Sequence, residues 1–338
     1  MKKNAEVFQS LTGKGVCAVV KANAYGHGAE ECTLALSGVV SAFAVATIDE
    51  AKAIKVAACG KDILIFTPPI TACEVVEAAR NGFIVSISSL HTAELVAAVS
   101  KRIGLTVRAH LKVNTGMNRY GMDERSLGKA CKLLQELASV RVEGIFSHLY
   151  ASALSSAEAQ RKRFLRSVVI AKRYFPSLIS HLSATYGALL GERFAFDLVR
   201  VGLGLYGYLP EGEGIEIRPK LEKVMQVFAR VTGNRIYRYG GVGYGEEKGK
   251  AMAGEELSLL RYGYADGFLR KKDGGAFGGE AQVGNLCMDA CIRKGRLPLG
   301  KWISVLTDAD ETAKKSGTIP YEVLCAATRR AEFLYVYE

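Results

Sequence analysis

Residues 105–148 read LTVRAHLKVNTGMNRYGMDERSLGKACKLLQELASVRVEGIFSH, and this stretch decides the fold. It contains an apolar run with strand character (105–113), a glycine-containing loop, an amphipathic segment (123–138) and a second apolar run (140–148). Asp123 stands where a helix N-cap is expected. A strand, a helix and a strand in this order are typical of a unit with parallel strands. The stretch therefore predicts an α/β fold.

The same alternation extends through the first 200 residues. Thr47 and Thr71 are further N-cap candidates, each followed by an amphipathic segment. The runs with strand character are 16–20, 42–46, 63–66, 83–87, 105–113, 140–148, 178–184 and 196–202. Eight such units favour a (β/α)8 TIM-type barrel over residues 1–215, with a doubly wound sheet as the alternative.

The hydrophobic pattern of the sequence changes at about residue 216, after which helical periodicity is weak. Runs with strand character are separated by glycine-rich stretches and lie at 224–239, 255–265, 280–292 and 301–307. This pattern predicts a smaller, mainly β C-terminal domain over residues 216–338. The glycine-rich segment 271–279 has no helix after it, so we do not expect it to be a phosphate-binding loop.

Composition and charge restrict the class of protein. Hydrophobic residues make up 49% and charged residues 23%, the balance of a globular protein that buries a core without disulfides or metal. The formal charge of +11 is spread along the chain, which favours a basic surface over a nucleic-acid site. The eight cysteines form no CxxC pair, which argues against a zinc site. With no apolar run long enough for a bilayer or a signal peptide, we expect a cytoplasmic protein with no membrane partner.

Polar residues follow several of the predicted strands. In a (β/α)8 barrel the active site lies at the C-terminal ends of the strands. The residues at those ends are Lys21, Lys112, Arg119, His148, His181, Thr185, Arg200, Gly202 and Leu203. Each has an ordinary explanation alone, such as a solvated lysine or a hydrogen-bonded structural histidine. Because they come from five strand ends, together they predict a site.

The segment AVVKANAYGHG (18–28) resembles the cofactor-lysine segment of the alanine racemase family. The resemblance continues, in the family's order, through HLKVNTGMNRYGM, SHL, HLSAT, LVRVGLGLYGY, RYGYADGF, GNLCMDA and TIPYEV. It covers nearly the whole chain. It implies a fold-type III pyridoxal-phosphate enzyme, an isomerase that interconverts L- and D-alanine for peptidoglycan.

The resemblance also implies catalytic roles. Lys21 would bind pyridoxal phosphate covalently and act as a base on one face of the substrate, and Tyr264 would act on the other. Arg200 would face the pyridine nitrogen, where a permanent cation disfavours protonation of the ring. The alternative for Arg200 is a salt bridge that closes the barrel. His148 would lie between Arg200 and the tyrosine in a hydrogen-bond chain.

Binding roles follow in the same way. The cofactor phosphate would be held by hydroxyl and backbone N–H groups, those of Tyr25, Thr185, Tyr321, Gly202 and Leu203. Arg119 would pair with the substrate carboxylate, together with the backbone N–H of Met288. Lys112 matches a position that is carbamylated in many relatives; the alternative is a lysine paired with an acid such as Asp289. In the family the tyrosine and methionine come from a second subunit, so a homodimer with shared active sites is implied.

Three other functions remain open from the sequence. A shortened segment between Tyr264 and Met288 leaves room for a racemase of serine or another small amino acid. A non-catalytic pyridoxal-phosphate-binding protein is a second alternative, against which the presence of Tyr264 and Met288 argues. A decarboxylase is the third, and Arg200 argues against it because decarboxylation is helped by a strong electron sink.

Overall fold

The computed structural model describes residues 1–150, 152–245, 251–269 and 282–337. The glycine-rich segment 271–279 lies outside the described residues. Internal contacts divide the chain into two units, which are residues 1–24 with 29–222, and residues 25–28 with 223–338. Each unit is described by itself.

The first unit is built on eight parallel strands in the order β7-β6-β5-β4-β3-β2-β1-β8. The strands are β1 (Gly15–Val19), β2 (Ala42–Val45), β3 (Asp62–Ile65), β4 (Ile84–Ile87), β5 (Val107–Lys112), β6 (Val140–Phe146), β7 (Ile179–His181) and β8 (Leu198–Val201). Two backbone bonds join the ends of the order, from Asp197 N to Ser180 O (3.0 Å) and from Arg200 N to Ser183 O (2.9 Å). The predicted (β/α)8 barrel is therefore confirmed.

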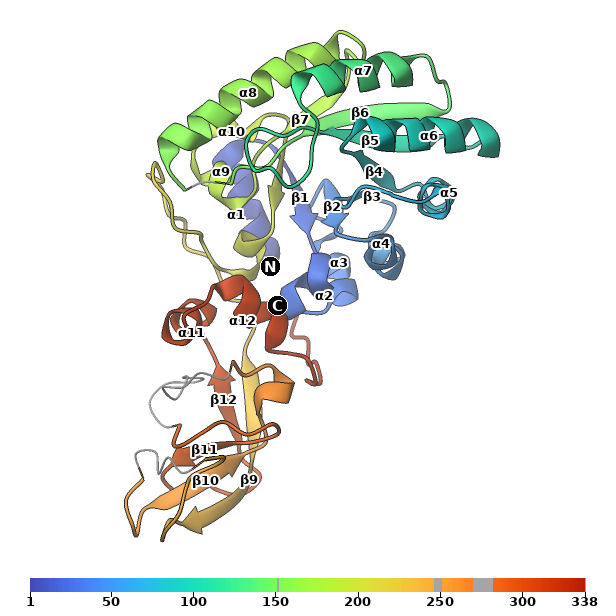
Figure 1. The fold of residues 1–338 in the computed structure, drawn as a ribbon. Coiled ribbons are helices and arrows are strands. Elements are labelled where there is room, and N and C mark those ends of the chain that lie inside the picture. Colours follow the sequence, from blue (N-terminus) through green and yellow to red (C-terminus); the bar gives the residue numbers. More distant parts are fainter. Residues whose placement is uncertain (151, 246–250, 270–281, 338) are drawn as a thin grey trace. The chain divides into compact units, whose positions relative to one another are not determined.

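Helices follow the strands, and Figure 1 shows α4 to α8 on the outside of the barrel. They are α1 (Lys2–Thr12), α2 (Lys21–Gly26), α3 (Ala29–Leu36), α4 (Ile48–Ile54), α5 (Ala72–Asn81), α6 (Leu90–Ile103), α7 (Glu124–Gln135), α8 (Leu154–Lys172), α9 (Thr185–Leu189), α10 (Glu192–Ala195) and the 3-10 helix η1 (Leu203–Tyr206). Thr47, Thr71 and Asp123 each accept a bond from the N3 backbone, so these predicted caps are confirmed. Within the described part of the chain, no helix is long and apolar enough to cross a membrane.

The second unit contains a four-stranded antiparallel sheet in the order β11-β10-β9-β12. Its elements are β9 (Val227–Ile236), β10 (Glu256–Leu260), the 3-10 helix η2 (Tyr264–Asp266), β11 (Cys291–Lys294), β12 (Trp302–Leu306), α11 (Ala309–Ser316) and α12 (Pro320–Ala326). Tyr237, Val242, Val283 and Leu257 of β10 form a small buried hydrophobic cluster in this unit. The mainly β character is confirmed, with two helices at the C-terminal end that the sequence pattern did not predict.

The buried side-chain amide of Asn4 holds helix α1 by hydrogen bonds to the backbone of Leu205 and Glu222. The Nδ2 of Asn4 donates to Leu205 O (3.0 Å) and to Glu222 O (2.8 Å), while Oδ1 accepts from Glu222 N (2.9 Å). The side chain is 1% exposed, so these backbone groups have little access to water. Asn4 therefore satisfies three backbone groups at once.

Asn4→Leu keeps the shape of this side chain but removes its hydrogen bonds. We expect the free energy of unfolding to fall by about 1–3 kcal/mol, because buried backbone groups lose their partners. Urea denaturation followed by far-ultraviolet circular dichroism measures it. The control is Lys3→Ala, which removes an exposed ion pair to the same residue, Glu222 (3.2 Å), and should change little. Equal effects of the two substitutions would contradict the role given to Asn4.

Candidate functional site

An unusual turn begins at Lys21, two residues after the end of β1. Lys21 is followed by Ala22, Asn23, Ala24 and Tyr25, whose φ angles are 53°, 52°, 52° and 53°. Consecutive non-glycine residues in this left-handed region are rare, and each costs about 1–2 kcal/mol. Backbone strain of this kind persists only where the surroundings enforce it, and it gathers at functional sites. The turn marks Lys21 as a functional candidate.

Glu50 holds the start of this turn. Its Oε1 accepts from Ala22 N (2.7 Å), and its Oε2 accepts from Ala46 N (2.7 Å) and belongs to the capping box with Thr47. Asn23 contributes a second tether, since its Oδ1 accepts from Ala29 N (2.8 Å). One carboxylate thus joins the end of β2, the cap of α4 and the residue after Lys21.

Arg200 lies inside the barrel on β8 and is 2% exposed. Its Nη1 donates to the Nδ1 and the carbonyl oxygen of His181 (both 2.8 Å), and its Nη2 donates to Ser147 O (2.6 Å) and Leu182 O (2.9 Å). A guanidinium has five N–H groups. Four are used here, and within the described residues the Nε–H has no acceptor.

The same contacts decide between the two interpretations of Arg200. Every acceptor is a neutral group, so a salt bridge that closes the barrel is not what the described residues form. Burial lowers the pKa of Arg200 to about 10. Among the described residues, the cation is held only by the dipoles of neutral acceptors. Such a site attracts a group that can accept a hydrogen bond from Nε.

A pocket lies beside the C-terminal ends of β5 and β6. Its lining residues include no acid and are Lys112, Val113, Asn114, Met117, Arg119, Tyr120, Ser147 and His148. Burial, with Arg200 as the second cause, lowers the pKa of both Lys112 and His148 well below their usual values. A pocket with a cationic arginine and no acid suits an anionic ligand such as a carboxylate.

Lys112 is 9% exposed, and its Nζ lies 4.3 Å from the centroid of the Phe146 ring. No ion pair to Lys112 occurs in the part of the chain that the structure describes. Asp289, the acid considered as its partner, pairs instead with Arg330 (2.8 Å).

His148 is half-buried and follows β6 by two residues. The fully buried Gln160 of α8 donates to His148 O (3.3 Å) and to Thr115 Oγ1 (3.4 Å), and Thr115 is bonded to Ser147 (2.8 Å). The loops after β5 and β6 are therefore tied together. Among the described residues, the side chain of Arg200 donates to His181 and not to the ring of His148.

Thr185 begins α9 and is 3% exposed. Its Oγ1 accepts from Gly204 N (3.2 Å), so it lies against η1, which has Gly202 as its N-cap and Leu203 as its first residue. The first N–H groups of a helix have no partner within it. These groups therefore form one candidate anion site at the end of β8.

The second unit brings the remaining predicted residues together in two pairs. Tyr25, which belongs to this unit, lies with its ring centroid 5.9 Å from that of Tyr321. Burial raises the pKa of both phenols, which keeps them as neutral donors. Tyr264 N donates to Cys287 O (3.1 Å), which places Tyr264 beside the segment of Met288. Met288 is 48% exposed, so this edge is open in the single chain.

Sequence reasoning missed two of these features. The sequence analysis did not single out Glu50, and nothing in the local pattern indicates its bond to Ala22. Gln160 lies on a helix whose sequence gives no sign that its amide reaches two strand-end loops. Both roles depend on contacts between segments that are distant in sequence.

Comparison with known proteins agrees with this geometry. The family models "Alanine racemase, N-terminal domain" and "Alanine racemase, C-terminal domain" match residues 1–210 and 224–335. The alanine racemase of Treponema pallidum is 31% identical over 99% of this chain and 97% of its own length. That of Streptococcus gordonii is 33% identical over 94% of this chain and 90% of its own length.

Solved structures give the same result. The alanine racemase of Streptomyces coelicolor has a TM-score of 0.87 at 27% identity and covers 100% of this chain and 96% of its own. The alanine racemase of Bartonella henselae, solved with covalently bound pyridoxal phosphate, has a TM-score of 0.85 at 28% identity over 99% of this chain and 96% of its own.

Glu50→Ala should loosen the turn after Lys21 without unfolding the barrel. Because Ala22 N loses its acceptor, we expect amide hydrogen exchange in a peptide covering residues 20–26 to rise by about tenfold. Exchange followed by mass spectrometry measures it, and Glu50→Gln, which keeps one oxygen, should show a smaller rise.

The control is Glu74→Ala in the matching capping box of α5, where Glu74 accepts from Ile70 N (2.8 Å) and Thr71 N (2.9 Å). It should leave the exchange of residues 20–26 unchanged. If Glu50→Ala also left it unchanged, the tether would not hold the turn.

Proposed function

The chain belongs to the alanine racemase family, and from that premise we propose that it interconverts L- and D-alanine with pyridoxal phosphate, using Lys21 and Tyr264 as the two bases. The observation that carries the proposal is the environment of Arg200. It is a buried cation with no carboxylate partner among the described residues, and its Nε–H has no acceptor there. The pyridine nitrogen of the cofactor is a neutral acceptor of the kind this group lacks.

The residues present fit the cofactor at both of its ends. Arg200 would meet the ring nitrogen, and Lys21 would carry the aldehyde carbon. The phosphate would be held by the hydroxyls of Tyr25, Thr185 and Tyr321 and by the N–H groups of Gly202 and Leu203, all of them neutral donors suited to a dianion. When bound, pyridoxal phosphate withdraws electron density from the substrate Cα and so acidifies its proton.

Two bases on opposite faces then account for racemisation. Lys21 Nζ holds or accepts the Cα proton on one face, and Tyr264 Oη does so on the other. Arg119, with Met288 N–H, binds the substrate carboxylate and so fixes which bond faces each base. Burial, and then the charge of Arg200, lowers the pKa of His148, so its imidazole is neutral. In this proposal the neutral ring would take part in the hydrogen-bond chain that leads to Tyr264.

The proposal includes a homodimer with shared sites. Tyr264 and Met288 are held together in the C-terminal domain, which we take as residues 216–338, and that edge is exposed in the single chain. We propose that it completes the site of the partner subunit. The proposed setting is the cytoplasm, where the product D-alanine supplies peptidoglycan.

A racemisation assay tests the function. The holoenzyme is given L-alanine and L-serine side by side, and D-alanine is expected to form. Lys21→Ala and Tyr264→Phe should each lower the rate by about 10²–10⁴-fold, because each removes one acid/base group. Tyr264→Phe should still bind the cofactor, as judged by its absorbance.

Three other outcomes would contradict the proposed alanine racemase activity or its mechanism. Cofactor binding without turnover of either substrate would favour a carrier. Faster turnover of serine than of alanine would move the enzyme to another substrate. Full activity in Tyr264→Phe would remove the two-base mechanism.

We also propose that Lys112 is carbamylated. Its Nζ would attack CO₂, forming an N–C bond and releasing a proton, and the burial that lowers its pKa leaves the free amine needed for this step. The new carboxylate would then orient Arg119, one of the cations that face it.

Carbamylation is tested by ¹³C NMR of protein equilibrated with ¹³C-labelled CO₂. A carbamate signal is expected that is lost in Lys112→Ala and kept in the control Lys132→Ala on α7. The same signal in both variants, or none in the unmodified protein, would refute the modification.

A further inference from the structure

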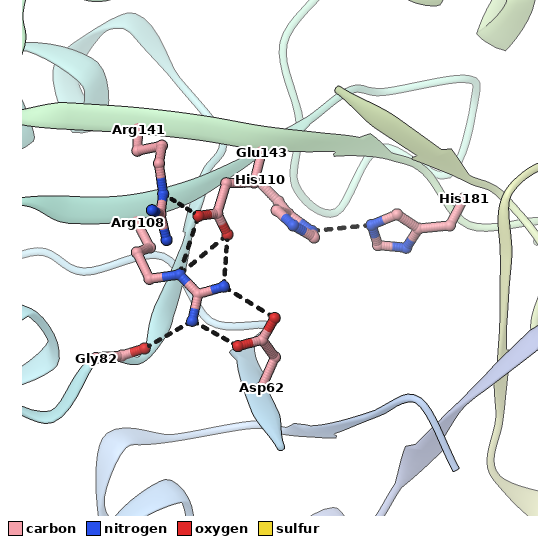
Figure 2. Close-up of polar contacts among 7 residues, drawn as sticks. All are labelled: Asp62, Gly82, Arg108, His110, Arg141, Glu143 and His181. Atoms are coloured by element: carbon pink, nitrogen blue, oxygen red, sulfur yellow. Dashed lines mark hydrogen bonds and ion pairs between the residues drawn. The ribbon is translucent and has the colours of Figure 1, made fainter. Parts of the chain in front are cut away.

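Two buried histidines extend the hydrogen-bonded contacts of Arg200 into the interior of the barrel. His181 on β7 and His110 on β5 are 0% and 4% exposed. The Nδ1 of His181 faces Arg200 Nη1 at 2.8 Å, and its Nε2 faces the Nδ1 of His110 at 3.0 Å. Figure 2 shows the two imidazoles pointing toward each other, joined by this contact.

The order of these contacts fixes the protons. A guanidinium only donates, so the Nδ1 of His181 must accept from Arg200. The proton of a neutral His181 then sits on Nε2 and is donated to His110, whose Nδ1 must accept. A cationic His181 would place an N–H against the N–H of Arg200. The hydrogen bonds from Arg200 to His181 and His110 therefore allow only one assignment of the imidazole protons.

The surroundings of His110 keep it neutral. Figure 2 shows the nearest carboxylates, Asp62 and Glu143, bonded to the guanidinium of Arg108, and Glu143 also to Arg141. No bond drawn there joins either acid to His110. Burial, then the charge of Arg108, lowers the pKa of His110 to about 3.

The backbone is shaped to place this ring. The register between β5 and β6 shifts after Ala109, so that His110 pairs with Gly144 rather than with Glu143. A Cβ at Gly144 would come within 2.8 Å of the His110 ring. Only a glycine leaves room for the imidazole in this position.

We propose that His110 is a positioning residue for the pyridine end of the site. By accepting from His181 it fixes His181 as the acceptor of Arg200, and so turns the guanidinium until its Nε–H is left for the ring nitrogen. The proposal rests on the proposed function, because it requires Arg200 to meet the cofactor.

Two variants of equal shape test the acceptor. His110→Leu removes it, whereas Asn in His110→Asn offers an oxygen near the place of Nδ1. In holoenzyme loaded with pyridoxal phosphate that carries ¹⁵N at the ring nitrogen, His110→Leu should move the ¹⁵N chemical shift away from its hydrogen-bonded value. It should also lower kcat/KM by about tenfold, as expected for one lost hydrogen bond.

His110→Asn should restore both readouts to within about threefold in rate, since it keeps an acceptor. Gly144→Ala, which keeps the imidazole but displaces it, should resemble His110→Leu and serves if that variant fails to fold. The control is His91→Asn, an exposed histidine on α6, which should leave the shift and rate unchanged.

The outcomes separate this inference from the proposed function. If Arg200→Lys moves the ¹⁵N shift but neither His110→Leu nor Gly144→Ala does, the role of His110 is overturned. Equal loss in His110→Asn and His110→Leu would also overturn it, because the acceptor would not matter. If Arg200→Lys leaves the shift unchanged, the proposed meeting of Arg200 with the cofactor fails, and the inference fails with it.

Discussion

Arg200 is a buried guanidinium without a counter-ion among the described residues, and the rest of the site depends on this constraint. Placing the charge of Arg200 inside a barrel is costly unless dipoles or an anion compensate it. Carbonyl oxygens at the ends of β6 and β7 supply part of that compensation. The remaining field acts on its neighbours: after burial, Arg200 is the second cause that lowers the pKa of Lys112, His148 and His181. Burial and this one charge together keep the surrounding bases neutral, and the charge makes the site receptive to anions.

The turn after Lys21 shows a second constraint, in which local strain is opposed by distant contacts. Four left-handed residues would not persist in an isolated peptide, because each is unfavourable for an L-amino acid. Glu50 from α4 holds the first of them, and in the second unit Thr328 Oγ1 donates to Gly26 O (2.7 Å) at its far end. The position of the lysine is thus determined by residues that are remote in sequence, and a lysine held in this way loses little freedom when it reacts.

The features that the sequence predicts are those set by interactions between residues close together in the chain. The eight strands and the caps at Thr47, Thr71 and Asp123 are set by local periodicity and capping, and all were predictable. The left-handed turn was not, because ANAY contains no glycine and its conformation is imposed by Glu50. The strand-end rule and the family resemblance singled out Lys112, His148 and Arg200. They did not reveal that Arg200 donates to His181, since the tautomer and direction of a buried contact are decided only by packing.

Closure of the barrel and the chemistry of the site meet at the same residue. The backbone N–H of Arg200 bonds Ser183 O across the gap between β8 and β7, while its side chain bonds carbonyl oxygens of His181 and Leu182 on the same side. Lysine has the charge but neither the planar fork nor the number of donors needed for four acceptors and a fifth group. A guanidinium is the one side chain that joins the last two strands and still has an N–H to offer. Among the described residues, the side chain of Arg200 contacts three carbonyl oxygens and the ring of His181, which in turn is bonded to His110. None of these groups is a carboxylate, so the guanidinium keeps its full charge at this point of the barrel.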